Sequence, residues 1–362
     1  MNDEQYMKLA LKLAQAHVGQ TSPNPMVGAL VVDRDGEIVG RGAYEKARAE
    51  HAEVIALREA GEKARAATLY VTLEPCSHHG RTPPCADAIV AAGISRVVSA
   101  MEDPDMRVRG AGFAKLRSHN INVEIGPLGE QAARMNRMYV HHRTTGRPFV
   151  TLKMAQSLDG AVASRSGERR QLTGKPVERY TRMLRYEHDA VMVGVGTVIV
   201  DDPLLTVRPN KPRAVPYRRV VVDARGRIPL KAKVTKDQAR ARTILATTDL
   251  MPAVTREALE KRGVTIFECA RSHDDRVDIN DLLAKLANAD IISVLCEGGP
   301  TLGASLLSGS HVNEVDWLIA PVLLGGPDAV AVIGNMSREL PLRLQTVRRL
   351  GDDVLVAAEI VH

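Results

Sequence analysis

Two stretches decide the fold of the N-terminal half: residues 51–53, which read HAE, and residues 75–85, which read PCSHHGRTPPC. They supply one imidazole, His51, and two thiols, Cys76 and Cys85. One neutral imidazole and two thiolates suit tetrahedral Zn²⁺. The fourth position of the tetrahedron is then left for water. We therefore predict a zinc site on these three side chains.

The spacing of the ligands favours a catalytic zinc site over a structural one. A structural site is usually closed by four protein ligands, with one ligand pair only two to four residues apart. Here eight residues, 77–84, separate the cysteines, and the histidine stands alone. His78 or His79 could in principle supply a fourth ligand. Only the catalytic interpretation gives Glu53 a role, because a carboxylate that is not a ligand can move protons as zinc deaminases require.

The sequence around these stretches alternates between the periods of strands and helices. It predicts an α/β domain built on one sheet. His51 would open one helix, and Cys85 would lead into the next. Helix starts carry unpaired N–H groups and a positive dipole end, which favour thiolate over thiol. We expect strands at 26–33, 37–40, 68–73, 96–101 and 122–125, and helices near 6–17, over 51–65, after 84 and over 111–118.

A polar segment at residues 141–148, which read HHRTTGRP, predicts a domain boundary. The length of 362 residues also favours two domains. We therefore predict one domain over residues 1–147 and a second over 148–362. The adjacent His141 and His142 are interpreted as solvated linker residues, because no cysteine or carboxylate partner lies near them in the sequence.

The second half predicts another α/β domain, with two glycine-bearing segments that follow strands. Residues 194–197 read GVGT and residues 297–303 read EGGPTLG. Neither fits the dinucleotide fingerprint G-x-G-x-x-G, which disfavours a standard Rossmann domain. Gly299-Pro300 before a helix could cradle an anion or could be an ordinary strand-to-helix turn. Strands are expected at 149–154, 190–193, 219–222, 243–246, 265–268 and 291–296.

Two arginines of the second half are candidates for binding a phosphate. Arg185 lies late on a predicted helix, where a lone arginine is usually solvated or interacts with the helix dipole. Arg208 follows the polar segment 201–206. Together the two guanidinium groups could clamp a substrate phosphate.

Composition limits the class of function. The chain has 44% apolar and 25% charged residues, a net charge of +6 and only 3% aromatics. The basic excess would suit nucleic acid, but stacking platforms are scarce and the basic residues are scattered. Anionic small molecules explain the charge equally well. Four cysteines, no basic and apolar start, and no long apolar run predict a cytoplasmic protein that does not enter a membrane.

At this point the residues resemble a known family. Residues 51–53 and 75–85, preceded by 23–28 (PNPMVG), look like the riboflavin-biosynthesis deaminase. The eight-residue cysteine spacing separates it from the shorter C-x-x-C of cytidine, adenosine and polynucleotide deaminases. Lys153 with 157–160, residues 197–208 and residues 297–303 look like the reductase that is fused to it. The resemblance covers essentially the whole chain.

The resemblance implies a cytidine-deaminase-like domain followed by a dihydrofolate-reductase-like domain that uses NADPH. It implies Zn²⁺ on His51, Cys76 and Cys85, and Glu53 as the catalytic proton shuttle. The pyrimidine pocket would be lined by Asn24, His78 and Arg81. NADPH would contact Ala155, Gln171, Thr197, Asp201, Ala224 and the segment Gly299, Pro300, Thr301, Leu302, Gly303, Ala304 and Ser305. The substrate of the reductase would contact Arg169, Arg185, Leu205, Arg208 and Glu297.

Three departures from the family pattern stand out. The family usually has histidine where Tyr44 stands and glycine where Arg48 stands. Its reductase half commonly reads Ser-x-Trp where residues 169–171 read RRQ. Asp105 occupies a position often held by asparagine. The zinc motif itself is intact.

The family implies two consecutive reactions on a phosphorylated pyrimidine. The first is hydrolytic deamination of 2,5-diamino-6-(5-phosphoribosylamino)pyrimidin-4-one, and the second is NADPH-dependent reduction of its ribosyl group to the ribityl form. We expect a homodimer or higher homo-oligomer, with neither nucleic acid nor membrane as partner. The alternative is a nucleic-acid-binding or editing deaminase, which predicts basic tracts interleaved with aromatics and needs no second α/β domain.

Overall fold

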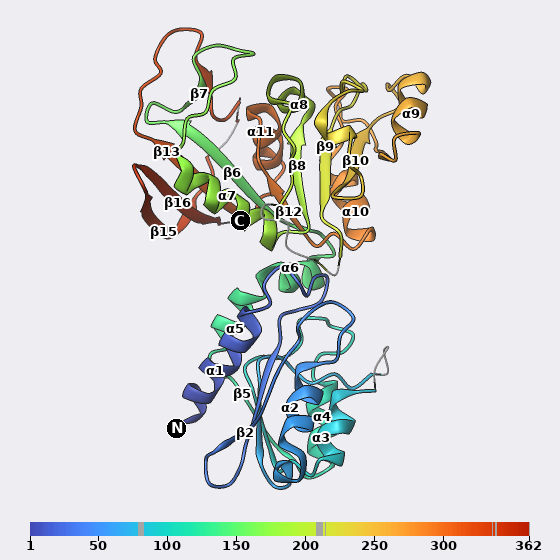
Figure 1. Ribbon diagram of the computed structural model, residues 1–362, viewed down its shortest axis with the longest axis vertical. Helices are drawn as coiled ribbons and strands as arrows, with labels where there is room; N and C mark the ends of the chain where they lie inside the picture. The colour runs from blue at the N-terminus through green and yellow to red at the C-terminus, as the bar shows by residue number, and fades with distance from the viewer. Residues whose placement is uncertain (79–82, 208–212, 214, 335, 337–338, 362) are drawn as a thin grey trace. The chain divides into compact units, whose positions relative to one another are not determined.

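The computed structural model describes residues 1–78, 83–207, 213, 215–334, 336 and 339–361 (Figure 1). The chain forms two compact units. The N-terminal unit comprises Met1–Gly146 with Arg213–Val215, and the C-terminal unit comprises Arg147–Pro212 with Pro216–His362.

The N-terminal unit contains a five-stranded sheet in the order β2-β1-β3-β4-β5. Strand β1 pairs antiparallel with β2 and β3, whereas β3, β4 and β5 are parallel. The predicted hairpin is confirmed, and the main chain of Asp33 and Glu37 closes its turn. The strands are β1 (Gly28–Val32), β2 (Ile38–Ala43), β3 (Thr68–Val71), β4 (Arg96–Ser99) and β5 (Asn122–Ile125).

Helices cover both faces of this sheet (Figure 1). One core, which includes Ala56, Ile89 and Leu116, lies between the sheet and α2, α3 and α4. The other core includes Met7 and Ala132 and lies under α1 and α5. The helices are α1 (Asp3–Gln15), α2 (Ala52–Ala60), α3 (Cys85–Ala91), α4 (Ala111–Ser118), α5 (Gly129–Met135) and α6 (Arg137–Thr145).

Two predicted segments differ from the structure. The helix expected over 51–65 ends at Ala60, because Gly61 turns to φ 54°, and the short 3₁₀ helix Gly61–Ala64 follows. The prediction that His141 and His142 lie in a linker is wrong, since both lie within α6. That helix ends at Gly146, whose left-handed conformation (φ 71°) is the usual C-terminal cap. The polar residues 141–148 had indicated a linker because they include both glycine and proline.

The C-terminal unit contains a nine-stranded sheet in the order β11-β10-β9-β8-β12-β6-β13-β16-β15. The first seven strands are parallel, and β16 and β15 run antiparallel to their neighbours. The sequence did not predict β13, β15 and β16. The strands are β6 (Phe149–Ser157), β8 (Ala190–Gly194), β9 (Arg218–Val222), β10 (Arg242–Thr247), β11 (Thr265–Glu268), β12 (Ser293–Cys296), β13 (Glu314–Ala320), β15 (Leu342–Leu350) and β16 (Asp353–Ile360), with β7 (Ala161–Ala163) and β14 (Val330–Ala331) in a separate pair.

Both faces of the central strands of the large sheet are buried, which explains why these strands are almost continuously apolar. On β8, Ala190 and Met192 belong to the core that packs against α10 and α11. Val191 and Val193 belong to the opposite core, with α8 and α9. The helices are α7 (Lys175–Glu187), α8 (Val195–Asp201), α9 (Ala253–Glu260), α10 (Ile279–Asn288) and α11 (Pro300–Ser308), together with the 3₁₀ turn Lys233–Thr235.

The packing of α2 on β2 depends on glycine and makes the first testable prediction. A Cβ at Gly42 would lie 1.9 Å from the carbonyl oxygen of Ala52, the first residue of α2. Gly42→Ala must therefore displace the start of this helix, and we expect a loss of about 1–3 kcal/mol in the free energy of unfolding. We also expect a lower zinc content, because His51 precedes Ala52.

The control is Gly174→Ala in the C-terminal unit, where the nearest atoms to the added Cβ lie 3.5 Å away. Its effect on unfolding should stay within about 0.5 kcal/mol. Equal zinc content and stability in Gly42→Ala and wild type would show that the close approach does not hold the helix in place.

Candidate functional site

The structure brings the three predicted zinc ligands together in the N-terminal unit. One ligand atom from each of His51, Cys76 and Cys85 lies within 4.8 Å of the others. Nδ1 of His51 is 3.1 Å from Sγ of Cys85 and 3.6 Å from Sγ of Cys76. These are the side chains and the spacing of a site that can close around one metal ion. The residues therefore fit zinc.

Two helix starts and one loop hold the ligands in place. His51 is the N-cap of α2, and Cys85 is the first residue of α3, which confirms the predicted placement at helix starts. The loop from β3 carries Cys76, whose Sγ accepts a hydrogen bond from the backbone N–H of Cys85 at 3.3 Å. That N–H is one of the unpaired donors at a helix start, so it favours negative charge on the sulfur.

The two thiols differ in acidity before any metal binds. A hydrogen bond from Cys85 and a further one from His51 lower the pKa of Cys76 to about 4, against the effect of burial. The hydrogen bond to Cys76 and burial raise the pKa of Cys85. The hydrogen bond with Cys76 also raises the pKa of His51. A metal must displace these protons, so its binding depends on pH.

Glu53 lies in the first turn of α2 and is only 4% exposed. Burial raises its pKa, although the positive charge of His51 opposes that shift. A raised pKa makes the carboxylate a stronger base, and a general acid and base must accept a proton and release it again. Glu53 is not in the group of metal ligands.

His78 and His79 are the two candidates for a fourth ligand. His78 is exposed and does not belong to the ligand group that the described part of the chain contains. His79 and Arg81 lie outside the described residues. The described ligand set therefore has three members, as expected for a catalytic site with one open position.

A buried carboxylate that the sequence reasoning missed supports the loop of Cys76. Glu74 is 6% exposed and accepts hydrogen bonds from the backbone N–H groups of Asp103, Gly110 and Gly112, at 2.8–3.1 Å. It thereby ties residues 103–112 to the metal loop. In the sequence, the only feature that could have indicated this role is that Glu74 stands directly before Pro75-Cys76.

Asn24, a predicted pyrimidine-binding residue, shares the hydroxyl of Tyr44 with the main chain of Arg48. Its side-chain NH₂ donates to Oη of Tyr44 at 2.7 Å. The same Oη accepts the backbone N–H of Arg48 at 2.8 Å. The ring of Tyr44 stands edge-on to the His51 ring, with centroids 5.7 Å apart.

In the C-terminal unit, the two glycine-bearing segments lie side by side at the carboxyl ends of β8 and β12. The N–H of Gly194 donates to the carbonyl of Gly298 at 3.2 Å. A Cβ at Gly299 would lie 3.6 Å from Oγ1 of Thr197. Gly299 caps α11, and Pro300 is its first residue, as predicted for a strand that passes into a helix.

The other predicted cofactor positions occupy neighbouring elements. Ala155 lies on β6, Asp201 ends α8, and Ala224 follows β9. Gln171 donates to the carbonyl of Thr173 at 3.1 Å. Nε of Arg169 lies 3.9 Å from Oδ1 of Asp201, although the side chain of Arg169 is mostly exposed. The remaining members of the segment, Thr301, Leu302, Gly303, Ala304 and Ser305, lie in α11.

Arg185 and Glu297, both predicted to bind substrate, form a buried ion pair. Nη2 of Arg185 donates to Glu297 at 2.8 Å, and its Nε donates to the other carboxylate oxygen. Arg185 is therefore not the solvated arginine that its helical position suggested. Leu205 is 3% exposed and packs in the core, while Arg208 lies outside the described residues.

Lys153, which belongs to one of the reductase-like motifs, lies among other charged side chains. Burial lowers the pKa of Lys153, and Arg185 adds to that shift, whereas Glu297 and Asp316 oppose it. Burial alone would raise the pKa of Glu297, but the charge and hydrogen bonds of Arg185 outweigh it, so that pKa is lowered. Charged side chains thus gather inside the C-terminal unit.

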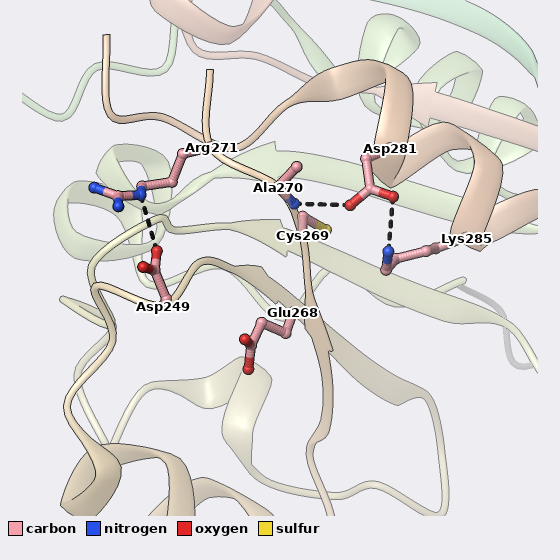
Figure 2. Close-up of a pocket in the computed structure, with 7 residues that line it drawn as sticks. All are labelled: Asp249, Glu268, Cys269, Ala270, Arg271, Asp281 and Lys285. Atoms are coloured by element: carbon pink, nitrogen blue, oxygen red, sulfur yellow. Dashed lines mark hydrogen bonds and ion pairs between the residues drawn. The ribbon is translucent and has the colours of Figure 1, made fainter. Parts of the chain in front are cut away.

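A hollow of about 490 Å³ lies elsewhere in the C-terminal unit, beyond the ends of β10 and β11 (Figure 2). Figure 2 shows two ion pairs in its lining, Arg271 with Asp249 and Lys285 with Asp281. Their N–O distances are 3.0 Å and 2.7 Å. Glu268, also in the lining, pairs with Arg256 outside the view. Burial raises the pKa of Cys269 to about 12, which keeps this thiol protonated. None of the predicted site residues lines the hollow.

The Arg185–Glu297 pair makes a stability prediction. Glu297→Gln should destabilise the C-terminal unit by about 2–4 kcal/mol at pH 7, because it leaves the Arg185 guanidinium buried without a counter-charge. The pKa of Glu297 is lower when folded than its ordinary value of 4.5. Its stabilising contribution is therefore present above that value and lost as the pH falls through the folded pKa. The variant should lose this acid-side dependence.

Urea unfolding at pH 7 and at pH 3–5, followed by the fluorescence of the single tryptophan, Trp317, reports on this unit alone. Glu178→Gln is the control, since it removes an exposed pair with Arg182 on α7 and should cost less than about 0.5 kcal/mol. If Glu297→Gln costs no more than the control, the pair does not stabilise the unit.

Two families match the chain, in the order that the sequence predicted. Residues 1–101 match the cytidine and deoxycytidylate deaminase zinc-binding region, and residues 148–356 match the RibD C-terminal domain. The cytidine-deaminase-like and dihydrofolate-reductase-like folds are confirmed.

Similar proteins match over nearly their whole length. The riboflavin biosynthesis protein RibD of Aquifex aeolicus is 41% identical over 98% of this chain and 97% of its own, and that of Escherichia coli is 39% identical over 98% of both. The structure of Acinetobacter baumannii RibD has a TM-score of 0.90 at 37% identity, with 99% of both chains covered.

A further solved structure carries both activities in its name. It is the diaminohydroxyphosphoribosylaminopyrimidine deaminase/5-amino-6-(5-phosphoribosylamino)uracil reductase of Thermotoga maritima, with a TM-score of 0.85, 33% identity and 99% of both chains covered. These full-length matches do not favour the nucleic-acid-binding or editing alternative. The chain belongs to the RibD family of bifunctional riboflavin-biosynthesis enzymes, in which a zinc-binding deaminase domain precedes a reductase domain.

Proposed function

We propose that this chain deaminates 2,5-diamino-6-(5-phosphoribosylamino)pyrimidin-4-one in residues 1–147 and reduces the product with NADPH in residues 148–362. Membership of the RibD family supports the pair of reactions. The observation that carries the first reaction is the three-ligand group of His51, Cys76 and Cys85, with Glu53 buried beside it.

In the deaminase site, His51, Cys76 and Cys85 would hold zinc. When bound there, zinc supplies a Lewis acid that activates water at neutral pH. Glu53 takes the proton of that water and delivers it to the departing ammonia, because its pKa is raised by burial. Asn24, His78 and Arg81 are proposed to line the pyrimidine pocket.

In the reductase site, the cofactor is proposed to lie along the carboxyl ends of the parallel strands. When bound there, NADPH would supply a hydride for the ribose carbon bonded to nitrogen. The bond from that carbon to the ring oxygen would break and the oxygen would take a proton, which gives the open ribityl chain. Helix α11 would offer its unpaired N–H groups to a phosphate, with Gly299 allowing close approach of the backbone. The proposed contacts are Ala155, Gln171, Thr197, Asp201, Ala224 and residues 299–305.

The substrate of the reductase is proposed to meet Arg169, Leu205, Arg208 and the Arg185–Glu297 pair. Glu297 already holds Nε and Nη2 of Arg185, and the carbonyl of Thr206 accepts from Nη1 at 3.3 Å. The pair therefore fixes the orientation of this guanidinium. Arg208 would then supply the larger share of the charge that binds the 5-phosphate.

We also propose that the protein forms a homo-oligomer and is located in the cytoplasm. The exposed edge strand β15, with Leu344 and Val347 about 60% exposed, supports a homodimer or higher homo-oligomer. Four free cysteines suit the reducing cytoplasm. Within the described residues, no helix has the length and apolar character needed to cross a membrane.

The two proposed sites should be separable by one substitution. Glu53→Gln removes the proton shuttle but no metal ligand, so we expect deamination to fall by about 10²–10⁴ with zinc retained. Given the diamino substrate and NADPH, the variant should release little ammonia and consume little NADPH. Supplying the deaminated compound should restore NADPH oxidation, because the reductase residues lie in the other unit.

Ammonia release, NADPH absorbance and zinc content measure the three outcomes, with wild type as the control. Loss of reduction of the supplied intermediate, with zinc and folding intact, would mean that the two reactions share one site. The division of the activities near residue 147 would then be wrong.

A further inference from the structure

The loop that carries Asn24 is held by a tyrosine that has no assigned role. The hairpin of β1 and β2 continues past its last strand pair, because the N–H of Tyr44 donates to the carbonyl of Val27 at 2.8 Å. This places Tyr44 opposite the segment that contains Asn24, three residues before Val27. The side chain of Tyr44 is 4% exposed.

The hydroxyl of Tyr44 accepts two hydrogen bonds and thereby fixes one orientation of the Asn24 amide. One bond comes from the NH₂ group of Asn24 and the other from the backbone of Arg48. A hydroxyl oxygen has two acceptor positions, so both are used. Among the hydrogen bonds of the described residues, the side-chain carbonyl of Asn24 accepts none.

Arg48, the second residue bonded to the hydroxyl of Tyr44, has an unusual main-chain conformation. Its φ of 71° lies in the left-handed region, which glycine adopts readily and arginine does not. The bond from its N–H to Tyr44 helps to hold that conformation. The loop that leads to His51 is therefore anchored to the same hydroxyl that orients Asn24.

We propose that Tyr44 is a positioning residue for deamination, which leaves the carbonyl oxygen of Asn24 to accept a hydrogen bond from an N–H or amino group of the pyrimidine. The inference rests on the proposed function, in which Asn24 contacts the substrate. The edge-on contact between the rings of Tyr44 and His51 places the Tyr44–Asn24 hydrogen bond close to a metal ligand. Tyr44 thus determines which side-chain atom of Asn24 forms a hydrogen bond with the substrate.

The first test compares Tyr44→Phe with the control Tyr6→Phe, which removes a hydroxyl that donates to the carbonyl of Gly36 at 2.7 Å. For the diamino substrate we expect Tyr44→Phe to raise KM about 3- to 10-fold, since one hydrogen bond that orients a binding group is lost. Its kcat should change by less than about twofold, as for an interaction equal in ground and transition states. Zinc content should match the control.

A second measurement needs no turnover: in protein labelled with ¹⁵N-asparagine, the side-chain NH₂ of Asn24 should exchange slowly with water in wild type and faster in Tyr44→Phe. An unchanged KM and unchanged exchange in Tyr44→Phe would overturn the inference. Loss of zinc in that variant would overturn it too, because Tyr44 would then act on the metal.

Asn24→Ala separates this inference from the proposed function on which it rests. If Asn24→Ala leaves KM unchanged, the assignment of Asn24 to the pyrimidine pocket fails. If Asn24→Ala raises KM while Tyr44→Phe does not, only the role of Tyr44 fails. The inference predicts that both single variants raise KM and that the double variant is no worse than Asn24→Ala.

Discussion

Three ligand atoms, from the start of α2, the loop after β3 and the start of α3, must converge within 4.8 Å before the N-terminal unit can bind its metal. Much of that unit serves this constraint. Gly42 lets the first turn of α2 lie directly on β2. The Glu74 carboxylate fastens residues 103–112 to the metal loop. Because α2 starts at the ligand His51, Glu53 in its first turn lies in the buried surroundings that raise its pKa.

In the C-terminal unit, apolar cores cover both faces of the central sheet. The proposed binding residues therefore gather at the ends of the strands. The segments that follow β8 and β12 meet there through the bond between Gly194 and Gly298. Arg185 and Glu297 bring charge into the interior of this unit as a pair, in which each group offsets the other. The deaminase and reductase chemistries thus draw on separate units, and each unit has its own sheet and cores.

The sequence predicted those parts whose signals are local. The metal ligands, the helix starts at His51 and Cys85, and the strand-to-helix turn at Gly299 all followed from short motifs. Strand β15 did not, because most of its residues are exposed on both faces and no period of two marks it. The end of helix α6 was mistaken for a linker, because His141 and His142 stand in a polar segment. The pairing of Arg185 with Glu297, which are 112 positions apart, follows from the fold alone.

The most direct test of the account is a crystal structure of the zinc-loaded enzyme with anomalous diffraction at the zinc edge. We expect one zinc per chain, with sulfur of Cys76 and Cys85 at about 2.3 Å, nitrogen of His51 at about 2.0–2.1 Å and a water as the fourth ligand. That open position is what makes the metal catalytic and gives Glu53 its role. A fourth bond from His78 or His79, with no solvent on the metal, would make the site structural and contradict the proposed deamination.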